Sequence, residues 1–270
     1  MSIKERFKVI ISDLDGTLLN NEHQISEYTK TIFQQLQSKN YLIIVATGRH
    51  HLDAMPLLES LGCPFYLVTS NGARIHSPTK ELIYSFDIKS DAIKSILNLN
   101  IDPEFTTVLF KEKVWQTNKD NKKLNRFQKV MNYPPEIVDF NTINDLSGIK
   151  LFFTHNDHHR LVELKDEIMK EHSDEFHYAF SLPFCLEFMD KSVDKSVAIA
   201  KILGIENHTF EQSISFGDGF NDEKMLISSG KSLIMENAVE SFKDKLPQLE
   251  VISSNENDGV ARYLSALLLS

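Results

Sequence analysis

Residues 8 to 19 read Lys8-Val9-Ile10-Ile11-Ser12-Asp13-Leu14-Asp15-Gly16-Thr17-Leu18-Leu19. The apolar run at the start does not alternate with polar residues, which is typical of a strand covered on both faces in a parallel sheet. Two carboxylates, Asp13 and Asp15, follow at its carboxyl end, where ligands bind in sheets of this kind. Gly16 then allows the chain to turn sharply. The stretch predicts a parallel sheet with two acids at its functional edge.

Two acids one residue apart can divide the work of a reaction. One carboxylate attacks or holds a metal, while the other moves a proton. A short Asp-x-Asp motif also occurs by chance in solvated loops. The remainder of the chain therefore has to decide between these two interpretations.

The first ~75 residues alternate between buried strands and amphipathic helices, which predicts a doubly wound α/β sheet with right-handed crossovers. A helix capped by Ser26 follows the first strand, and a strand over 41–46 ends in Thr47-Gly48-Arg49. A second helix ends at Gly62, and a strand over 65–68 ends in Thr69-Ser70-Asn71-Gly72. Polar residues thus gather after each strand.

The pattern changes at residue 82, where an alternating, half-exposed strand is predicted. Hairpins mixed with helices then continue to residue 188, which predicts an inserted α+β module over 82–188 within a core of 1–81 and 189–270. The predicted elements of the module are strands at 82–88, 148–153, 176–181 and 185–189, a hairpin of two strands over 106–117 that turns at 111–113, and helices at 121–131 and 157–171. Those of the returning core are helices at 195–203 (ended by Gly204), 223–229 and 260–269, and strands at 214–216, 232–235 and 251–253.

Four groups of polar residues share the carboxyl edge of the predicted sheet. They are Asp13 with Asp15, Thr47, Asn71, and the segment Gly217-Asp218-Gly219-Phe220-Asn221-Asp222. Carboxylates that face one cavity repel each other unless a cation lies between them, and oxygen ligands of this kind suit Mg²⁺. Lys195 and the Thr47 hydroxyl would add a positive charge and a donor, which completes a clamp for a phosphoryl group.

Each of these motifs has a simpler explanation when taken alone. A Gly/Asp-rich segment forms turns, and a helix lysine is usually solvated. The prediction of a metal and phosphate site therefore rests on their occurrence together, in order, on the expected elements.

The composition limits the classes of function. The 270 residues are 41% hydrophobic and 25% charged, with a net charge of −9, which is ordinary for a soluble globular protein. The acidic balance argues against a nucleic-acid or anionic-membrane surface, and no apolar run reaches the length of a membrane span. We expect a cytoplasmic monomer or small homo-oligomer, with reduced Cys63 and Cys185.

The motifs resemble those of the haloacid dehalogenase-like (HAD) superfamily of phosphatases, and most closely its Cof-type class IIB branch. The resemblance covers the whole chain, and the inserted module falls where that branch carries its C2B-type α/β cap. One departure is Ser196, which follows Lys195 where the family commonly has glycine. The segments that carry the resemblance are Asp13-Leu14-Asp15-Gly16-Thr17-Leu18, Ala46-Thr47-Gly48-Arg49, Lys195, Gly217-Asp218-Gly219-Phe220-Asn221-Asp222, Ser70-Asn71-Gly72-Ala73, Glu236-Asn237-Ala238 and Asn257-Asp258-Gly259-Val260-Ala261.

The resemblance implies a role for each matching position. Asp13 would attack phosphorus and form an aspartyl phosphate, and Asp15 would act as the general acid and base. Mg²⁺ would be held by Asp13, the Asp15 backbone carbonyl and Asp218. Asp222 would lie close by, either as a further ligand or as a residue that supports the ligands. Catalytic roles are implied for Asp13, Asp15, Thr47 and Lys195, and substrate or phosphate binding for Leu14, Gly16, Thr47, Gly48, Arg49, Asn71, Lys195 and Asn221.

The expected function is a Mg²⁺-dependent phosphatase that acts on a small phosphorylated metabolite, such as a sugar phosphate or a phosphorylated cofactor. Two alternatives stay open. A phosphomutase would return the phosphoryl group to the substrate, and a non-catalytic switch would bind Mg²⁺ and accept a phosphoryl group for signalling. The cap would exclude water and determine which substrate is accepted.

Overall fold

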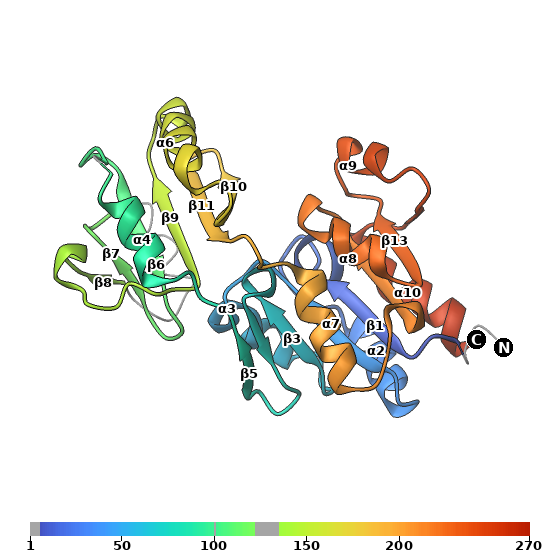
Figure 1. The fold of residues 1–270 in the computed structure, drawn as a ribbon. Helices are drawn as coiled ribbons and strands as arrows, with labels where there is room; N and C mark the ends of the chain where they lie inside the picture. Colours follow the sequence, from blue (N-terminus) through green and yellow to red (C-terminus); the bar gives the residue numbers. More distant parts are fainter. Residues whose placement is uncertain (1–5, 100, 122–134) are drawn as a thin grey trace. The chain divides into compact units, whose positions relative to one another are not determined.

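The computed structural model describes residues 6–99, 101–121 and 135–270 (Figure 1). The chain divides into two compact units, one formed by Met1–Ser85 with Asp194–Ser270 and the other by Phe86–Val193. The second unit is therefore inserted into the first. In the described part of the chain, no helix has the length and apolar character that crossing a membrane requires.

The first unit is built on an eight-stranded sheet with the order β14-β13-β12-β1-β2-β3-β4-β5. Neighbours from β14 to β3 pair in parallel, and β4 and β5 are antiparallel additions at one edge. The strands are β1 (Val9–Asp13), β2 (Leu42–Ala46), β3 (Tyr66–Thr69), β4 (Arg74–His76), β5 (Leu82–Ser85), β12 (Ser213–Gly217), β13 (Lys231–Met235) and β14 (Glu250–Ile252). The doubly wound, mostly parallel sheet predicted from the sequence is confirmed.

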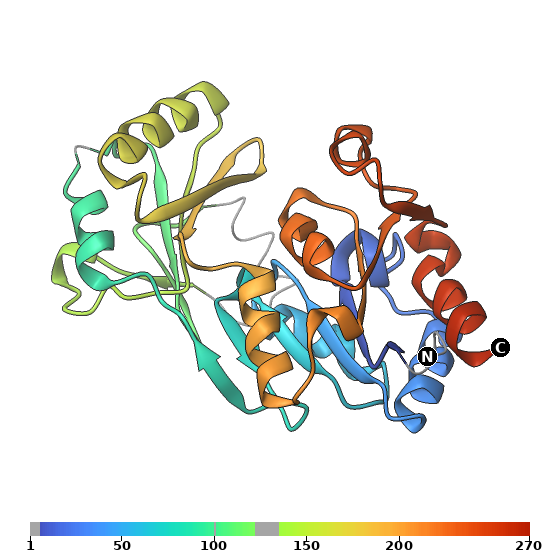
Figure 2. The same cartoon turned by 45° about the vertical axis from the view of Figure 1, so that its right-hand side comes forward.

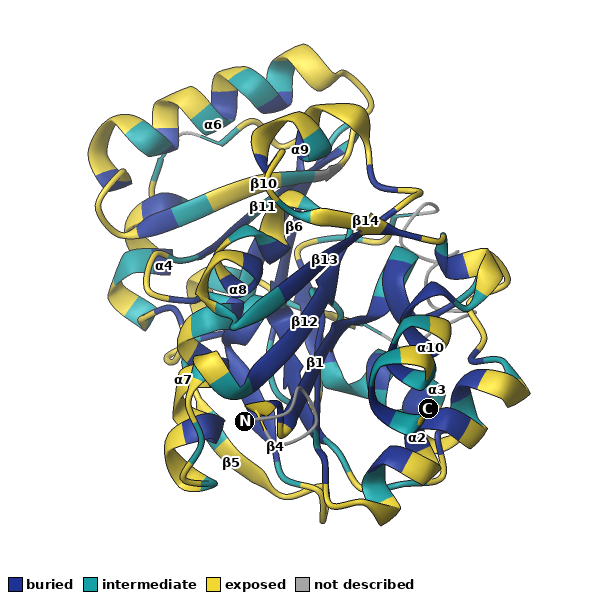
Figure 3. Cartoon of the chain, turned by 90° about the vertical axis from the view of Figure 1, so that its right-hand side faces the viewer, coloured by how far each residue is buried: buried dark blue, intermediate teal, exposed yellow. Residues whose placement is uncertain are grey.

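Helices cover both faces of this sheet (Figure 1; Figure 2). Ile10 of β1 packs in one apolar cluster with residues of α2 (Glu27–Ser38), α3 (His51–Glu59) and α10 (Gly259–Leu264). Its neighbours Val9 and Ile11 pack in another cluster with residues of α7 (Lys195–Ile205), α8 (Glu223–Ser228) and α9 (Glu240–Lys245). Figure 3 shows the strands β1, β12 and β13 largely dark blue between these layers. Burial on both faces explains why β1 has no polar alternation.

Short single turns complete the unit and carry several of the predicted site residues. They occur at Leu14–Leu18, Ser70–Gly72, Phe210–Gln212, Phe220–Asp222, Asn255–Asn257 and Ser265–Leu269. Ser26 caps α2 as predicted, because its side chain accepts a hydrogen bond from the Thr29 amide at 3.0 Å.

Three details of the core differ from the sequence prediction. Strand β5 (Leu82–Ser85) pairs with β4 in the core sheet, so the inserted unit begins at Phe86 instead of residue 82. Because β5 is an edge strand with exposed side chains, its alternation resembled that of a separate module. The inserted unit also ends at Val193 instead of 188, since β11 continues to Asp190. Helix α7 continues through Gly204 to Ile205, so that glycine does not end the helix.

In its described residues, the second unit contains a six-stranded sheet with the order β10-β11-β9-β6-β7-β8. Helices α4 (Ser90–Leu97) and α6 (His158–His172) contribute Ile93 and Leu161 to an apolar cluster with Phe153 of β9. A helix was predicted over 121–131, and all of this segment except residue 121 lies outside the described residues. The strands are β6 (Thr106–Phe110), β7 (Trp115–Thr117), β8 (Glu136–Ile137), β9 (Lys150–Thr154), β10 (Phe176–Leu182) and β11 (Cys185–Asp190), with a turn at Phe140–Thr142.

Candidate active site

The predicted site residues gather at the carboxyl edge of the core sheet. Asp13 is the last residue of β1 and pairs in register with Ala46, the last residue of β2, so Thr47 follows directly beside it. On the other side, β12 pairs in parallel with β1 and ends at Gly217, immediately before Asp218. Parallel pairing therefore brings together residues more than 200 positions apart, as expected for ligand sites in sheets of this kind.

Lys195 bridges two of the acids in the interior. Its Nζ donates to Asp13 Oδ1 at 2.6 Å and to Asp222 Oδ1 at 2.7 Å. The three side chains are 0%, 7% and 1% exposed. Lys195 is the first residue of α7, whose N-terminus is capped by Asp194. The departure at Ser196 strengthens this cap, because its amide and hydroxyl both donate to Asp194 Oδ1 at 2.8 and 2.6 Å.

Asp13, Asp218 and Asp222 form an acidic cluster in which one carboxylate oxygen from each lies within 4.8 Å of the others. Burial, together with the charge of Asp222, raises the pKa of Asp13 well above its usual range, although Lys195 opposes the shift. Burial and the charge of Asp222 also raise the pKa of Asp218 to about 6. Burial alone would lower the pKa of Lys195, but its two carboxylate partners raise it overall. Lys195 thus contacts two of the three clustered carboxylates, Asp13 and Asp222.

The donor set of this cluster suits a divalent cation. It offers only oxygen ligands, and the excess of carboxylates over ammonium groups leaves negative charge that a second cation would neutralise. The acidic cluster predicted from the sequence can therefore hold a metal ion.

The loop Leu14–Leu18 sets the position of Asp218. Gly16 adopts a left-handed conformation with φ of +74°, and a Cβ atom there would lie 2.3 Å from Asp218 Oδ2. Thr17 Oγ1 donates to Asp218 Oδ1 at 2.9 Å. The role of Thr17 was missed in the sequence, where it lies in the first motif without any indication of its partner. The Leu14 side chain is buried in the core, so only its backbone can serve a ligand.

Asp15 is held by Arg49 instead of joining the acidic cluster. Arg49 donates from Nε to Asp15 Oδ2 at 2.7 Å and from Nη2 to Asp15 Oδ1 at 2.6 Å, a bidentate pair. The hydrogen bond to Asp15 is the main reason why the pKa of Arg49 is raised. Asp15 is 41% exposed, and His23 Nδ1 lies 3.6 Å from its Oδ1. The sequence predicted both Arg49 and Asp15 as site residues but did not predict their pairing.

The remaining predicted residues lie on neighbouring turns. Thr47 is buried, and its hydroxyl accepts from the Arg49 amide at 3.1 Å. Asn71, which has a positive φ of 56°, accepts at Oδ1 from Asn221 Nδ2 at 3.1 Å. A Cβ atom at Gly48 would lie 3.2 Å from the same oxygen. The hydrogen bond between Asn71 and Asn221 therefore links the turn after β3 to the turn after β12, close to Gly48.

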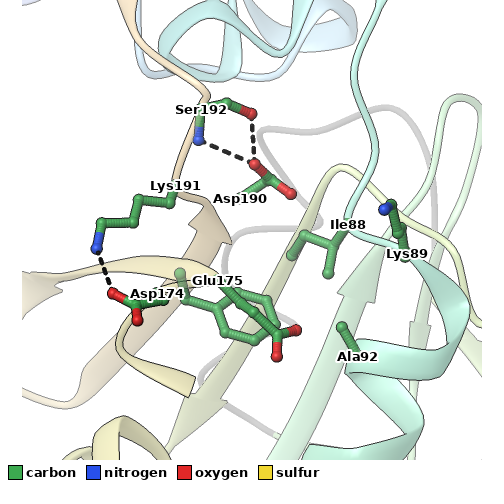
Figure 4. A pocket seen from close by; sticks show the side chains of 9 residues that line it. Ile88, Lys89, Ala92, Asp174, Glu175, Asp190, Lys191 and Ser192 are labelled. Carbon is green, nitrogen blue, oxygen red and sulfur yellow. Dashed lines mark hydrogen bonds and ion pairs between the residues drawn. The ribbon is translucent and has the colours of Figure 1, made fainter.

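A separate cavity of about 510 Å³ lies in the second unit. Figure 4 shows charged side chains around it, some of which already pair with one another. Ser192 donates twice to Asp190, and Lys191 pairs with Asp174. None of the predicted site residues is among its described lining residues.

Comparison with known proteins identifies the family. The family model described as haloacid dehalogenase-like hydrolase matches residues 10–264. The chain is 35% identical over 262 residues to a protein of Buchnera aphidicola subsp. Baizongia pistaciae, covering 97% of this chain and 98% of that one. It is 31% identical over 264 residues to a protein of Yersinia pseudotuberculosis named HMP-PP phosphatase, covering 98% and 96% of the two chains.

Solved structures share the fold over nearly the whole chain. A crystal structure from Thermotoga maritima has 26% identity and a TM-score of 0.83, and the match covers 96% of this chain and 97% of that one. A structure described as a HAD subclass IIB sugar phosphatase has 21% identity and a TM-score of 0.80, with 96% and 98% covered. The family model and the relatives above 30% identity show that the protein belongs to the haloacid dehalogenase-like hydrolase family, within which it is a phosphatase.

Proposed function

We propose that the protein is a Mg²⁺-dependent phosphatase that hydrolyses a phosphomonoester of a small metabolite through an aspartyl-phosphate intermediate. The observation that supports this proposal best is the buried arrangement in which Lys195 lies 2.6 Å from Asp13 Oδ1 beside the acidic cluster. An ammonium group and a metal next to one aspartate would keep that carboxylate ionised and offset the charge of an incoming phosphoryl group.

Asp13 is the proposed nucleophile. Its carboxylate oxygen would form a bond to phosphorus while the bond from phosphorus to the leaving oxygen breaks, and Asp15 would give its proton to that oxygen. Asp15 would then take a proton from the water that attacks the aspartyl phosphate, which restores Asp13. Bound Mg²⁺ would be held by Asp13, the Asp15 backbone carbonyl and Asp218, with Asp222 alongside, and would neutralise charge on the phosphoryl oxygens.

The surrounding residues would bind and orient the phosphoryl group. Lys195 and the buried Thr47 hydroxyl are the proposed contacts to its oxygens, and the backbone of Leu14, Gly16 and Gly48 lies on the neighbouring loops. Arg49 is bound to Asp15 in this structure, and it would orient that carboxylate for proton transfer. Asn71 and Asn221 are linked by a hydrogen bond and would contribute to the substrate side of the site.

The relatives suggest the class of substrate. One is named HMP-PP phosphatase, and a structural neighbour is described as a sugar phosphatase. We therefore propose a small phosphorylated metabolite as substrate, with the inserted unit as the cap that selects it. The cytoplasmic location, the monomer or small homo-oligomer, and the absence of nucleic-acid and membrane partners stay predictions from the sequence.

The test is phosphate release from a panel of sugar phosphates, phosphorylated cofactors and HMP-PP, with p-nitrophenyl phosphate as a general substrate and Mg²⁺ present. Asp13→Asn removes the nucleophile, and we expect the rate to fall on the order of 10³-fold or more. Asp244→Asn is the matched control, because Asp244 is exposed on α9 and is not part of the acidic cluster. An Asp13→Asn variant with the wild-type rate would refute the proposal.

The same assay separates the two alternatives. Free phosphate released without any added bisphosphate excludes a phosphomutase that depends on such an activator. A long-lived aspartyl phosphate on the wild-type protein, detected by mass spectrometry without turnover, would instead indicate a phosphoacceptor switch.

A further inference from the structure

Two asparagines, Asn237 and Asn255, connect the far strands of the core sheet to the loop that carries Asp15. Asn237 follows β13, and Asn255 follows β14. Asn237 Nδ2 donates to the Gly16 carbonyl at 2.7 Å. The backbone N–H of Asn255 donates to Asn237 Oδ1 at 3.0 Å, and the side-chain Nδ2 of Asn255 donates to the Leu19 carbonyl at 2.8 Å. We call this pair the asparagine brace.

The brace forms hydrogen bonds to the loop at two points, the Gly16 and Leu19 carbonyls. The loop from Leu14 to Leu19 closes on itself, because the Leu19 amide donates to the Leu14 carbonyl at 2.9 Å. Inside it, Asp15 and Gly16 have non-helical backbone angles. Because the backbone departs from helical geometry at these two residues, contacts from outside the loop help to determine which conformation it keeps. Asn237 holds the middle of the loop and Asn255 holds its end.

The brace itself is anchored on both sides. The turn that presents Asn237 is fixed by the Glu236 amide, which donates to the Ile252 carbonyl at 2.8 Å, and by the Ala238 amide, which donates to the Met235 carbonyl at 3.0 Å. Asn255 is only 7% exposed. Its turn is tied to the start of α2, since Asp258 accepts from Ser26 Oγ at 2.5 Å and from Thr29 Oγ1 at 3.0 Å.

The loop in turn places the reactive groups. Its Thr17 hydroxyl bonds Asp218, and its Gly16 backbone leaves no room for a Cβ atom against the Asp218 carboxylate. A shift of the Gly16 peptide would therefore move Asp15 and Asp218 together. No hydrogen bond that the structure gives for Asn237 or Asn255 reaches the carboxylates of the acidic cluster, so both act through the loop.

We propose that Asn237, supported by Asn255, is a positioning residue that fixes the loop after Asp13 for phosphoryl transfer and for metal binding. The inference rests on the proposed function, and phosphoryl transfer depends strongly on such positioning. A misplacement of about 1 Å costs on the order of 10²-fold in rate.

The test uses two variants at one position. Asn237→Ala removes the donor to the Gly16 carbonyl, and Asn237→Asp keeps the shape of the side chain but places an acceptor against that carbonyl. Asn237 is exposed, so both variants are expected to fold. The matched controls are Asn257→Ala and Asn257→Asp, because Asn257 lies on the same turn as Asn255. Among the described residues, its side chain bonds locally, to Ser254 Oγ at 3.0 Å.

We expect both Asn237 variants to lower kcat by about tenfold or more, with KM within about twofold and thermal midpoints equal to those of the controls. Calorimetric titration with Mg²⁺ gives a second measurement that does not depend on turnover. The Asn237→Ala variant is the one compared in this titration, because the added charge of the aspartate variant would itself attract the cation. We expect the affinity of Asn237→Ala for Mg²⁺ to be lower than that of the wild-type protein by about threefold or more.

The inference is overturned if the Asn237 and Asn257 variants have equal kcat and equal Mg²⁺ affinity. It is also overturned if kcat falls only in proportion to the folded fraction, because that result indicates a purely structural role. If the wild-type protein releases no phosphate at all, the proposed function fails, and the Mg²⁺ titration alone then supports or overturns the positioning of the loop.

Discussion

Replacement of Lys195 by methionine tests the electrostatic core of the site. The ammonium group is fully buried and donates to Asp13 and Asp222, whose side chains are 7% and 1% exposed. Methionine has a similar length and fills similar space, but it carries no charge and donates no hydrogen bond. The variant therefore leaves two buried carboxylates without the cation that they share.

The expected loss is large. Removal of one partner from a buried ion pair lowers the free energy of unfolding by about 3–5 kcal/mol, because the remaining charge is uncompensated. At about 2–4 °C per kcal/mol for a chain of this size, the thermal midpoint should fall by roughly 6–20 °C.

The loss should also depend on pH. Lys195 lowers the pKa of Asp13, so its removal raises that pKa further. Asp13 then takes up a proton in mildly acidic solution, and the deficit of the variant should be smaller at pH 5 than at pH 8.

The assay is urea unfolding in EDTA, followed by far-UV circular dichroism. The single tryptophan, Trp115, lies in the inserted unit, so its fluorescence reports on the part of the chain that the substitution leaves unchanged. Lys201→Met is the matched control, since Lys201 is exposed on the same helix and contacts the Tyr84 ring at 4.5 Å. We expect the control to cost about 1 kcal/mol or less. If Lys195→Met loses no more than the control at pH 8, the reasoning is refuted.

Two further predictions concern the core unit. In EDTA, the wild-type free energy of unfolding should fall as pH rises from about 4 to about 6. The pKa of Asp218 is raised in the folded state, which therefore binds more protons than the unfolded state in this pH range. Urea unfolding at several pH values should show a smaller change of the free energy of unfolding with pH for Asp218→Asn. An equal slope in that variant would assign the effect to other groups. Gly204→Ala should raise the free energy of unfolding by about 0.5–1 kcal/mol, since Gly204 lies inside α7 and a Cβ atom added there would meet nothing within 4 Å; a lower thermal midpoint would contradict this.

Local sequence patterns were sufficient to predict the sheet and most of the polar residues at its carboxyl edge. The unbroken apolar run at Val9–Ile11 predicted a strand buried on both faces, and the carboxyl ends of parallel strands lie at one edge of the sheet. Asp13, Thr47 and Asp218 were predicted together for that reason, and the register of β1 with β2 and β12 confirms their common edge. The sequence does not distinguish an exposed edge strand from the start of a new unit, which is why β5 was assigned to the wrong unit.

The partners of the polar groups were decided only by the tertiary structure. Arg49 and Asp15 are 34 residues apart, and Asn237 and Gly16 are 221 apart, so no periodicity links them. Hydrogen bonds depend on differences in distance of a few tenths of an ångström, which only the packed backbone fixes, whereas burial follows the pattern of apolar and polar residues along each strand. The amino-acid sequence by itself therefore determined which residues line the edge of the sheet, and the fold determined which of them hold one another in place.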